Sequence, residues 1–169
     1  MKRVLAFLLT GLFVAVSWAV QTVSRVEINW IEPEKFTDVR PSNESRQRFR
    51  ERTFEDIKKY MEKLMGSLPE GQKLLMNVTD LDLAGQVWPG SFVGLNSASD
   101  VRLIKRIDIP RMRFDYKLLD NSGNIIKEET VDLKDMSFQD KHNPLFDSES
   151  LRYEKNMLRE WFQETFEQK

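Results

Sequence analysis

The chain of 169 residues contains no cysteine, so it can form neither a disulfide bond nor a zinc site that uses thiolates. It has a single histidine, His142, in a segment typical of an exposed loop, and it lacks G-x-S-x-G. A serine-type triad therefore has no convincing base or nucleophile. The common glycine-rich phosphate loops are missing as well. These absences argue against the familiar enzyme classes, and we expect no cofactor.

Glycine, proline and excess charge are also scarce. Seven glycines and six prolines are too few for a disordered linker protein, and 26 basic residues nearly balance 27 acidic ones. A chain with a net charge of −1 has no overall field that would attract nucleic acid. We therefore expect no nucleic-acid partner.

The apolar run at the N-terminus, Val4 to Val16, is short. Its thirteen residues fall below the roughly 20 that a membrane-spanning helix needs. Lys2 and Arg3 precede it and Ser17-Trp18-Ala19 follows, which is the layout of a secretory signal peptide. We expect residues 1–19 to be a signal peptide cleaved after Ala19, with no stable membrane insertion afterwards. Residues 20–169 should form one soluble domain, with 24 basic and 27 acidic residues.

The first half of this domain predicts a strand, a helix and a second strand. Alternating apolar residues indicate a strand over Val23–Ile31. An apolar stripe of period three to four indicates a helix from about Ser42 to Met65, capped by Ser42 or Asn43, with Gly66 as a left-handed exit. The second strand, Lys73 to about Leu83, changes its apolar parity and so requires a bulge near Thr79-Asp80.

The second half predicts a hairpin and a final helix. A third strand over Val101–Leu119, a turn at Asp120–Gly123 and a fourth strand over Ile125–Asp135 form the hairpin. A last helix, capped by Asp147 or Ser148, should bury one face. The residues of that face are Leu151, Leu158, Trp161, Phe162 and Phe166. The order predicts an α+β fold: a single two-layer domain with a mostly antiparallel four-stranded sheet and both helices on one face. The first strand-helix-strand unit could instead add one parallel pair.

Asp80 and Asp82 are the first candidates for chemistry. Residues two apart on an undistorted strand point the same way, so the two carboxylates could lie about 7 Å apart and hold a hard cation or share acid and base roles. No further ligand follows at a regular spacing, and the predicted bulge falls here. We favour the alternative that this is a strand end whose aspartates face water or turn amides.

The segment Gly85–Asp100 is predicted to be a long loop, and it carries apolar residues whose exposure to water is unfavourable. Trp88 and Phe92 could fold back as a lid on the core, or they could form an exposed recognition patch. We favour the lid. The outer face of the third strand carries Arg111 and Arg113, which complete the set of candidate binding residues.

Five segments resemble a known family: FTDVR, LPEGQ, TDLDLAG, DVRLIKRIDIPRMRFDYKLLD and SLRYEKNMLREWF. They are similar, in matching order, to the exported bacterial family catalogued as domain of unknown function 3016. The resemblance implies a protein of the Gram-negative periplasm and brings no activity, ligand or catalytic residue. Together with the residues, it leads us to expect a non-catalytic binding or interaction module. The sequence does not identify its partner, and another periplasmic protein is one candidate. The alternative is a metal-dependent or carboxylate-based hydrolase that uses Asp80 and Asp82.

Overall fold

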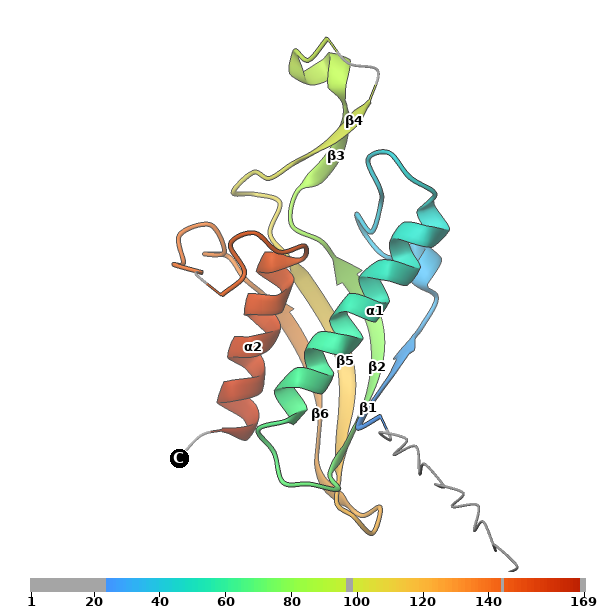
Figure 1. Cartoon of the computed structure of the whole chain (residues 1–169), viewed down its shortest axis with the longest axis vertical. Coiled ribbons are helices and arrows are strands. Elements are labelled where there is room, and N and C mark those ends of the chain that lie inside the picture. Colours follow the sequence, from blue (N-terminus) through green and yellow to red (C-terminus); the bar gives the residue numbers. More distant parts are fainter. Residues whose placement is uncertain (1–23, 97–98, 144, 168–169) are drawn as a thin grey trace, which may run out of the picture.

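A four-stranded sheet forms one layer of the molecule (Figure 1). The computed structural model describes residues 24–96, 99–143 and 145–167, so the predicted signal peptide lies outside the described residues. The strands are β1 (Val26–Trp30), β2 (Lys73–Asp82), β5 (Arg111–Leu119) and β6 (Ile125–Lys134), in the order β1-β2-β5-β6. β1 runs parallel to β2, and the other two pairs are antiparallel. The sheet is therefore mixed, as the alternative for the first strand-helix-strand unit allows.

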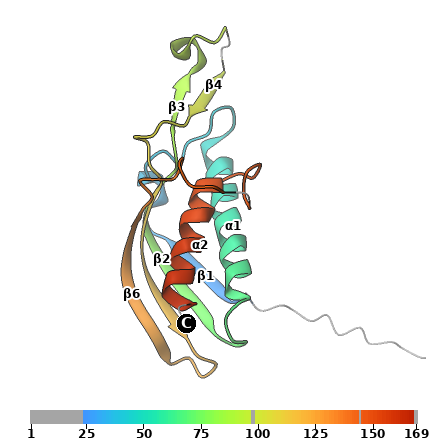
Figure 2. The ribbon, with the colours of Figure 1, turned by 90° about the vertical axis from the view of Figure 1, so that its left-hand side faces the viewer.

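Two helices form the second layer. α1 (Arg46–Met65) and α2 (Arg152–Phe166) both lie on one face of the sheet and leave the other face open (Figures 1 and 2). The strands explain the arrangement, because β5 alternates strictly between exposed and buried side chains. The predicted α+β fold with both helices on one face is confirmed.

The predicted bulge in β2 is also confirmed. The register of β2 against β5 shifts between Val78 and Asp80, so Thr79 is the extra residue. Val78 and Leu81 are both fully buried, which a regular strand could not achieve for residues three apart. The bulge thus keeps apolar side chains in the core along the whole strand.

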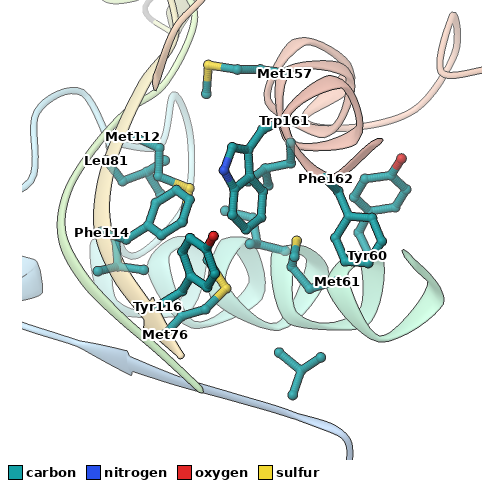
Figure 3. Packing of buried hydrophobic residues seen from close by; sticks show 14 of the residues in the cluster. Tyr60, Met61, Met76, Leu81, Met112, Phe114, Tyr116, Met157, Trp161 and Phe162 are labelled. Carbon is teal, nitrogen blue, oxygen red and sulfur yellow. The ribbon is translucent and has the colours of Figure 1, made fainter. Parts of the chain in front are cut away.

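The core fills the space between the sheet and the helices. Trp161 of α2 lies at its centre, where its ring meets Phe114 edge-to-face at 4.9 Å and Tyr116 at 5.3 Å (Figure 3). Met61 and Ile57 bring α1 into the same cluster. The structure has no disulfide because the chain has no cysteine, so this apolar packing is the main source of its stability.

Both helices start later than predicted. α1 is capped by Ser45, whose hydroxyl accepts from the amide of Arg48 at 3.5 Å, and not by Ser42 or Asn43. Gly66 has φ −62, so the predicted left-handed exit is wrong; the chain leaves α1 through one more turn. The cap of α2 is Leu151, with φ 56 and no capping side chain.

The late start of α2 has a packing reason. Phe146 is buried and meets the ring of Tyr60 of α1 at 5.3 Å, edge-to-face. A helix that began at Asp147 or Ser148 would have to start immediately beside this anchored ring. The chain instead makes further turns before the helix begins at Arg152.

The third predicted strand is divided in two. β5 begins only at Arg111, whereas β4 (Asp100–Leu103) pairs with β3 (Gln86–Pro89) in a separate two-stranded sheet. The short helix η2 (Gly90–Val93) lies between them. We call residues 86–103 the arm, because Figure 1 shows this hairpin projecting beyond the end of the main sheet. The rest of the predicted strand, residues 104–110, connects the arm to β5, and Ile107 there is exposed.

Candidate functional site

Gly85 directs the chain from the main sheet into the arm. Its φ of 79 lies in the left-handed region, and a Cβ atom there would come within 2.3 Å of the carbonyl oxygen of Leu103. Only glycine fits this close approach of two backbones. The chain therefore enters and leaves the arm side by side, at the base of the arm.

Arg102 of β4 fastens the arm to the rest of the described chain, which we call the body. One of its terminal nitrogens donates to the carbonyls of Ala84 and Gly85 at 3.2 and 2.8 Å. The other donates to the carbonyls of Asp38 and Arg40 at 2.7 and 2.8 Å. Both terminal nitrogens are thus occupied by backbone oxygens, and the side chain acts as a clamp.

Arg102 lies near three carboxylates in a region that is partly shielded from water. Burial lowers the pKa of the Arg102 guanidinium, and the carboxylates of Asp38, Glu154 and Asp82 oppose that shift. On the other side of the connection, Arg106 makes a two-pronged ion pair with Asp140, with distances of 3.0 and 2.6 Å. This second contact is exposed, so Arg102 is the main attachment of the arm.

The outer part of the arm is exposed and apolar. Phe92 has 79% of its surface exposed and Leu95 has 47%. Trp88 is half-buried, with the ammonium of Lys105 4.6 Å from its ring centre. Neither Trp88 nor Phe92 belongs to the core cluster, so the favoured expectation of a core lid is wrong. The reason is that β3 and β4 pair with each other and carry the segment away from the sheet.

A cavity of about 380 Å³ opens at the base of the arm. We call it the arm pocket. Its wall is mainly apolar and comes from α1, the end of β2, the connection after β4 and the start of α2; the apolar residues are Phe49, Leu83, Ala84, Ile104, Leu151 and Tyr153. Its polar residues are Arg102, Ser150, Arg152 and Glu154. An apolar cavity with a few convergent polar groups is the usual form of a ligand site.

Glu154 is the buried acid of the arm pocket. Only 3% of its surface is exposed, and its carboxylate accepts from the amide of Ala84 at 2.7 Å. Burial raises the pKa of Glu154, while the amides of Ala84 and Glu154 and the guanidinium of Arg102 act against the shift. The pocket therefore joins an apolar wall to a carboxyl group that resists ionisation.

The predicted aspartates and arginines meet on the open face of the sheet. Asp80 is paired in register with Arg113, and Asp82 with Arg111. Arg113 also lies 3.4 Å from Asp132 of β6. Each carboxylate thus has an arginine as its cross-strand neighbour. Across the described residues, no group of three His, Cys, Asp or Glu side chains could hold a metal ion.

Asp82 nevertheless has an unusual environment. Burial raises its pKa from 3.8 to about 6, and the carboxylates of Asp38 and Asp80 add to the shift. The guanidinium groups of Arg111 and Arg102 oppose it. Asp38 is distant from Asp82 in the sequence, and its φ of 48 lies in the left-handed region.

Sequence reasoning missed the residues that form the arm pocket. Glu154 lies among the polar positions of the α2 pattern, and Arg102 lies in what reads as a regular strand. Their roles are indicated only by the close packing of residues 38–40, 84–85 and 102. These segments are distant in the sequence and come together only in the folded chain. The structure places Trp88 and Phe92 on the arm, and Arg111 and Arg113 on the open face of the sheet below it.

These features define an α+β two-layer domain with a projecting arm and an apolar pocket at the arm's base. No helix in the described part of the chain is long and apolar enough to cross a membrane. The chain belongs to the family described as "Protein of unknown function (DUF3016)", whose model matches residues 24–164. Comparison with curated proteins finds no significant match, and comparison with solved structures finds none either.

Proposed function

We propose that the protein is an exported, non-catalytic interaction module that binds its partner with the arm and the arm pocket. The observation that carries this proposal is the exposed apolar tip of the arm, where Phe92 is 79% and Leu95 47% exposed. Residues 86–99, which make up most of the arm, include no charged side chain. Burial of such a tip against a partner is favourable, by about 1.5–3 kcal/mol for one large side chain.

The arm has no role in the core that would account for its apolar tip. The buried cluster passes from Leu83 directly to Met112 in sequence and includes no arm residue. Exposed aromatic residues on a projecting element are typical anchors of protein interfaces. A binding role is the simplest reason for placing Phe92 in water.

Arg111 and Arg113 form a charged rim on the open face of the sheet, on the side away from the arm pocket, and we include them as a polar edge of the surface that the arm presents. Both are exposed, and Arg111 pairs in register with Asp82, three residues before the turn at Gly85. Rim charges steer a partner and set its orientation more than they add affinity. The two arginines are therefore expected to influence the rate of association.

The hydrolase alternative receives no comparable support. Arginines face Asp80 and Asp82 across the sheet, so each carboxylate already has a cationic neighbour. His142 is exposed on the loop before α2. We therefore propose binding without catalysis.

The experiment begins with the protein recovered from the periplasm, whose intact mass should match a chain that starts at Val20. This protein is then used to capture partners from periplasmic extract. Phe92→Asp should abolish capture, while the free energy of unfolding changes by no more than about 0.5 kcal/mol because the ring is exposed.

Ile126→Asp is the matched control. It places the same charge at a residue that is 50% exposed on β6, outside the arm. This variant should capture partners as the wild type does. Equal capture by all three proteins would refute the role of the arm, and full-length chain in the membrane fraction would refute export.

A further inference from the structure

We infer that the arm of this protein binds a second copy of the same chain, and that the tip of each arm enters the arm pocket of the other copy. This inference rests on the proposed function, since it takes the arm as the interacting element and names its partner. Its basis is that one chain carries both halves of the contact: an exposed apolar tip at Phe92 and Leu95, and an apolar cavity of about 380 Å³.

The positions of tip and pocket suit a two-fold axis. They lie at opposite ends of the arm, and the four residues of β3 span about 13 Å at the usual rise per residue. A two-fold rotation about an axis across the middle of the arm exchanges its ends. It therefore brings each tip to the base of the other arm, and both contacts form together. Such self-complementary pairing is the commonest form of homodimer.

The arm also lacks strand partners of its own. Within the described part of the chain, β3 and β4 pair only with each other, over four residues each. An isolated two-stranded hairpin is at best marginally stable in water. A second arm beside it would offer hydrogen bonds to an outer edge.

The chemistry of the two surfaces is compatible. The tip, Gly90–Val93 followed by Gly94 and Leu95, brings no charge into the pocket. It therefore leaves the buried charges in their existing pairs: Arg102 keeps its four carbonyl acceptors and Glu154 keeps the amide of Ala84. Phe92 can pack against the apolar wall formed by Phe49, Leu83, Ile104 and Tyr153. A charged tip would incur a desolvation penalty there.

Disulfide trapping tests the arrangement directly, because the natural chain has no cysteine. Ser91→Cys places a thiol on the tip, and Ser150→Cys places one on the pocket wall. Each variant is prepared separately and the two are mixed under mild oxidation. We expect a disulfide-linked heterodimer, with far less linked dimer from either variant alone, because a disulfide requires Cα atoms within about 7 Å.

The mass in solution is the second measurement. Light scattering on the wild-type mature chain should give twice the monomer mass. Phe92→Asp should give the monomer mass, and Ile126→Asp should keep the dimer. Thermal melts of the three proteins confirm that each variant is folded.

Several outcomes would overturn the inference. Wild-type protein that stays monomeric at high concentration is one, and efficient linking of Ser91→Cys to itself, which indicates contact between two tips, is another. Monomeric protein that sediments with phosphatidylglycerol vesicles in a Phe92-dependent way would assign the tip to a bilayer. A monomer whose arm captures a different protein would refute the dimer while the proposed function stands.

Discussion

At the scale of single residues, Asp82 shows how position changes the chemistry of an ordinary side chain. It is half-buried at the end of β2, and burial together with the Asp38 carboxylate raises its pKa from 3.8 to about 6. Burial disfavours the charged carboxylate in the folded protein, so the neutral form of Asp82 favours folding. This contribution to stability is present only at low pH. This contribution is complete below about pH 4 and is lost as the pH rises through about 6.

Asp82→Asn should remove this pH dependence. Relative to the wild type, the variant should gain stability between about pH 4 and about pH 7, since asparagine has no charge to bury. Urea unfolding across this range measures the difference. Asp80→Asn should lessen the pH dependence without removing it, because the Asp80 carboxylate adds to the shift while the burial of Asp82 stays. A difference in unfolding free energy between the wild type and Asp82→Asn that stays constant with pH would contradict this prediction.

At the scale of elements, the sequence predicts what is local and periodic. Three of the four main strands, both helices and the bulge at Thr79 follow from apolar spacing, which reflects burial on one face. β6 is mostly exposed and follows from the turn that precedes it. The arm does not follow from it, because β3 and β4 are too short to show a period and are stabilised by pairing with each other. The predicted start of α2 is wrong for a related reason: the segment before it is held by the contact between Phe146 and Tyr60, which is long-range and leaves no local pattern.

The candidate site divides in the same way. Trp88 and Phe92 were recognisable as apolar residues in a segment of turn formers, and only their direction was wrong. Arg102 and Glu154 were not recognisable, because their roles depend on backbone carbonyls and an amide from distant segments. A polar residue that hydrogen-bonds to backbone groups far away in the sequence produces no recognisable pattern in the sequence around it.

The clamp formed by Arg102 should control the order of the arm. Arg102→Met removes the hydrogen bonds to four carbonyls, so we expect the arm to open locally at a free energy lower by about 1–3 kcal/mol. Hydrogen exchange of the arm amides should rise while exchange in β2 and β5 stays slow. Arg106→Met is the matched control, because its exposed ion pair with Asp140 contributes only about 0–1 kcal/mol. Equal protection of the arm in both variants would show that Arg102 is not the clamp.

At the scale of the whole molecule, the body and the arm divide the work of stability and recognition. All of the buried cluster lies in the body, where Trp161 joins α2 to the rings of β5. The described part of the arm contributes an apolar tip and no core residue. The chain has no cysteine, so the body is stabilised by packing without a disulfide, and Arg102 provides the main hydrogen bonds between arm and body.

Removal of the arm tests this division. Residues 86–103 are replaced by an Asn-Gly turn, which is feasible because Gly85 and Leu103 lie against each other. We expect the shortened chain to fold cooperatively, with an unfolding free energy lower by no more than about 1–2 kcal/mol, mainly from the lost hydrogen bonds of Arg102. Circular dichroism with urea melts measures the stability, and light scattering should show a monomer. A shortened chain that fails to fold would contradict this division, because the arm would then be part of the folding unit.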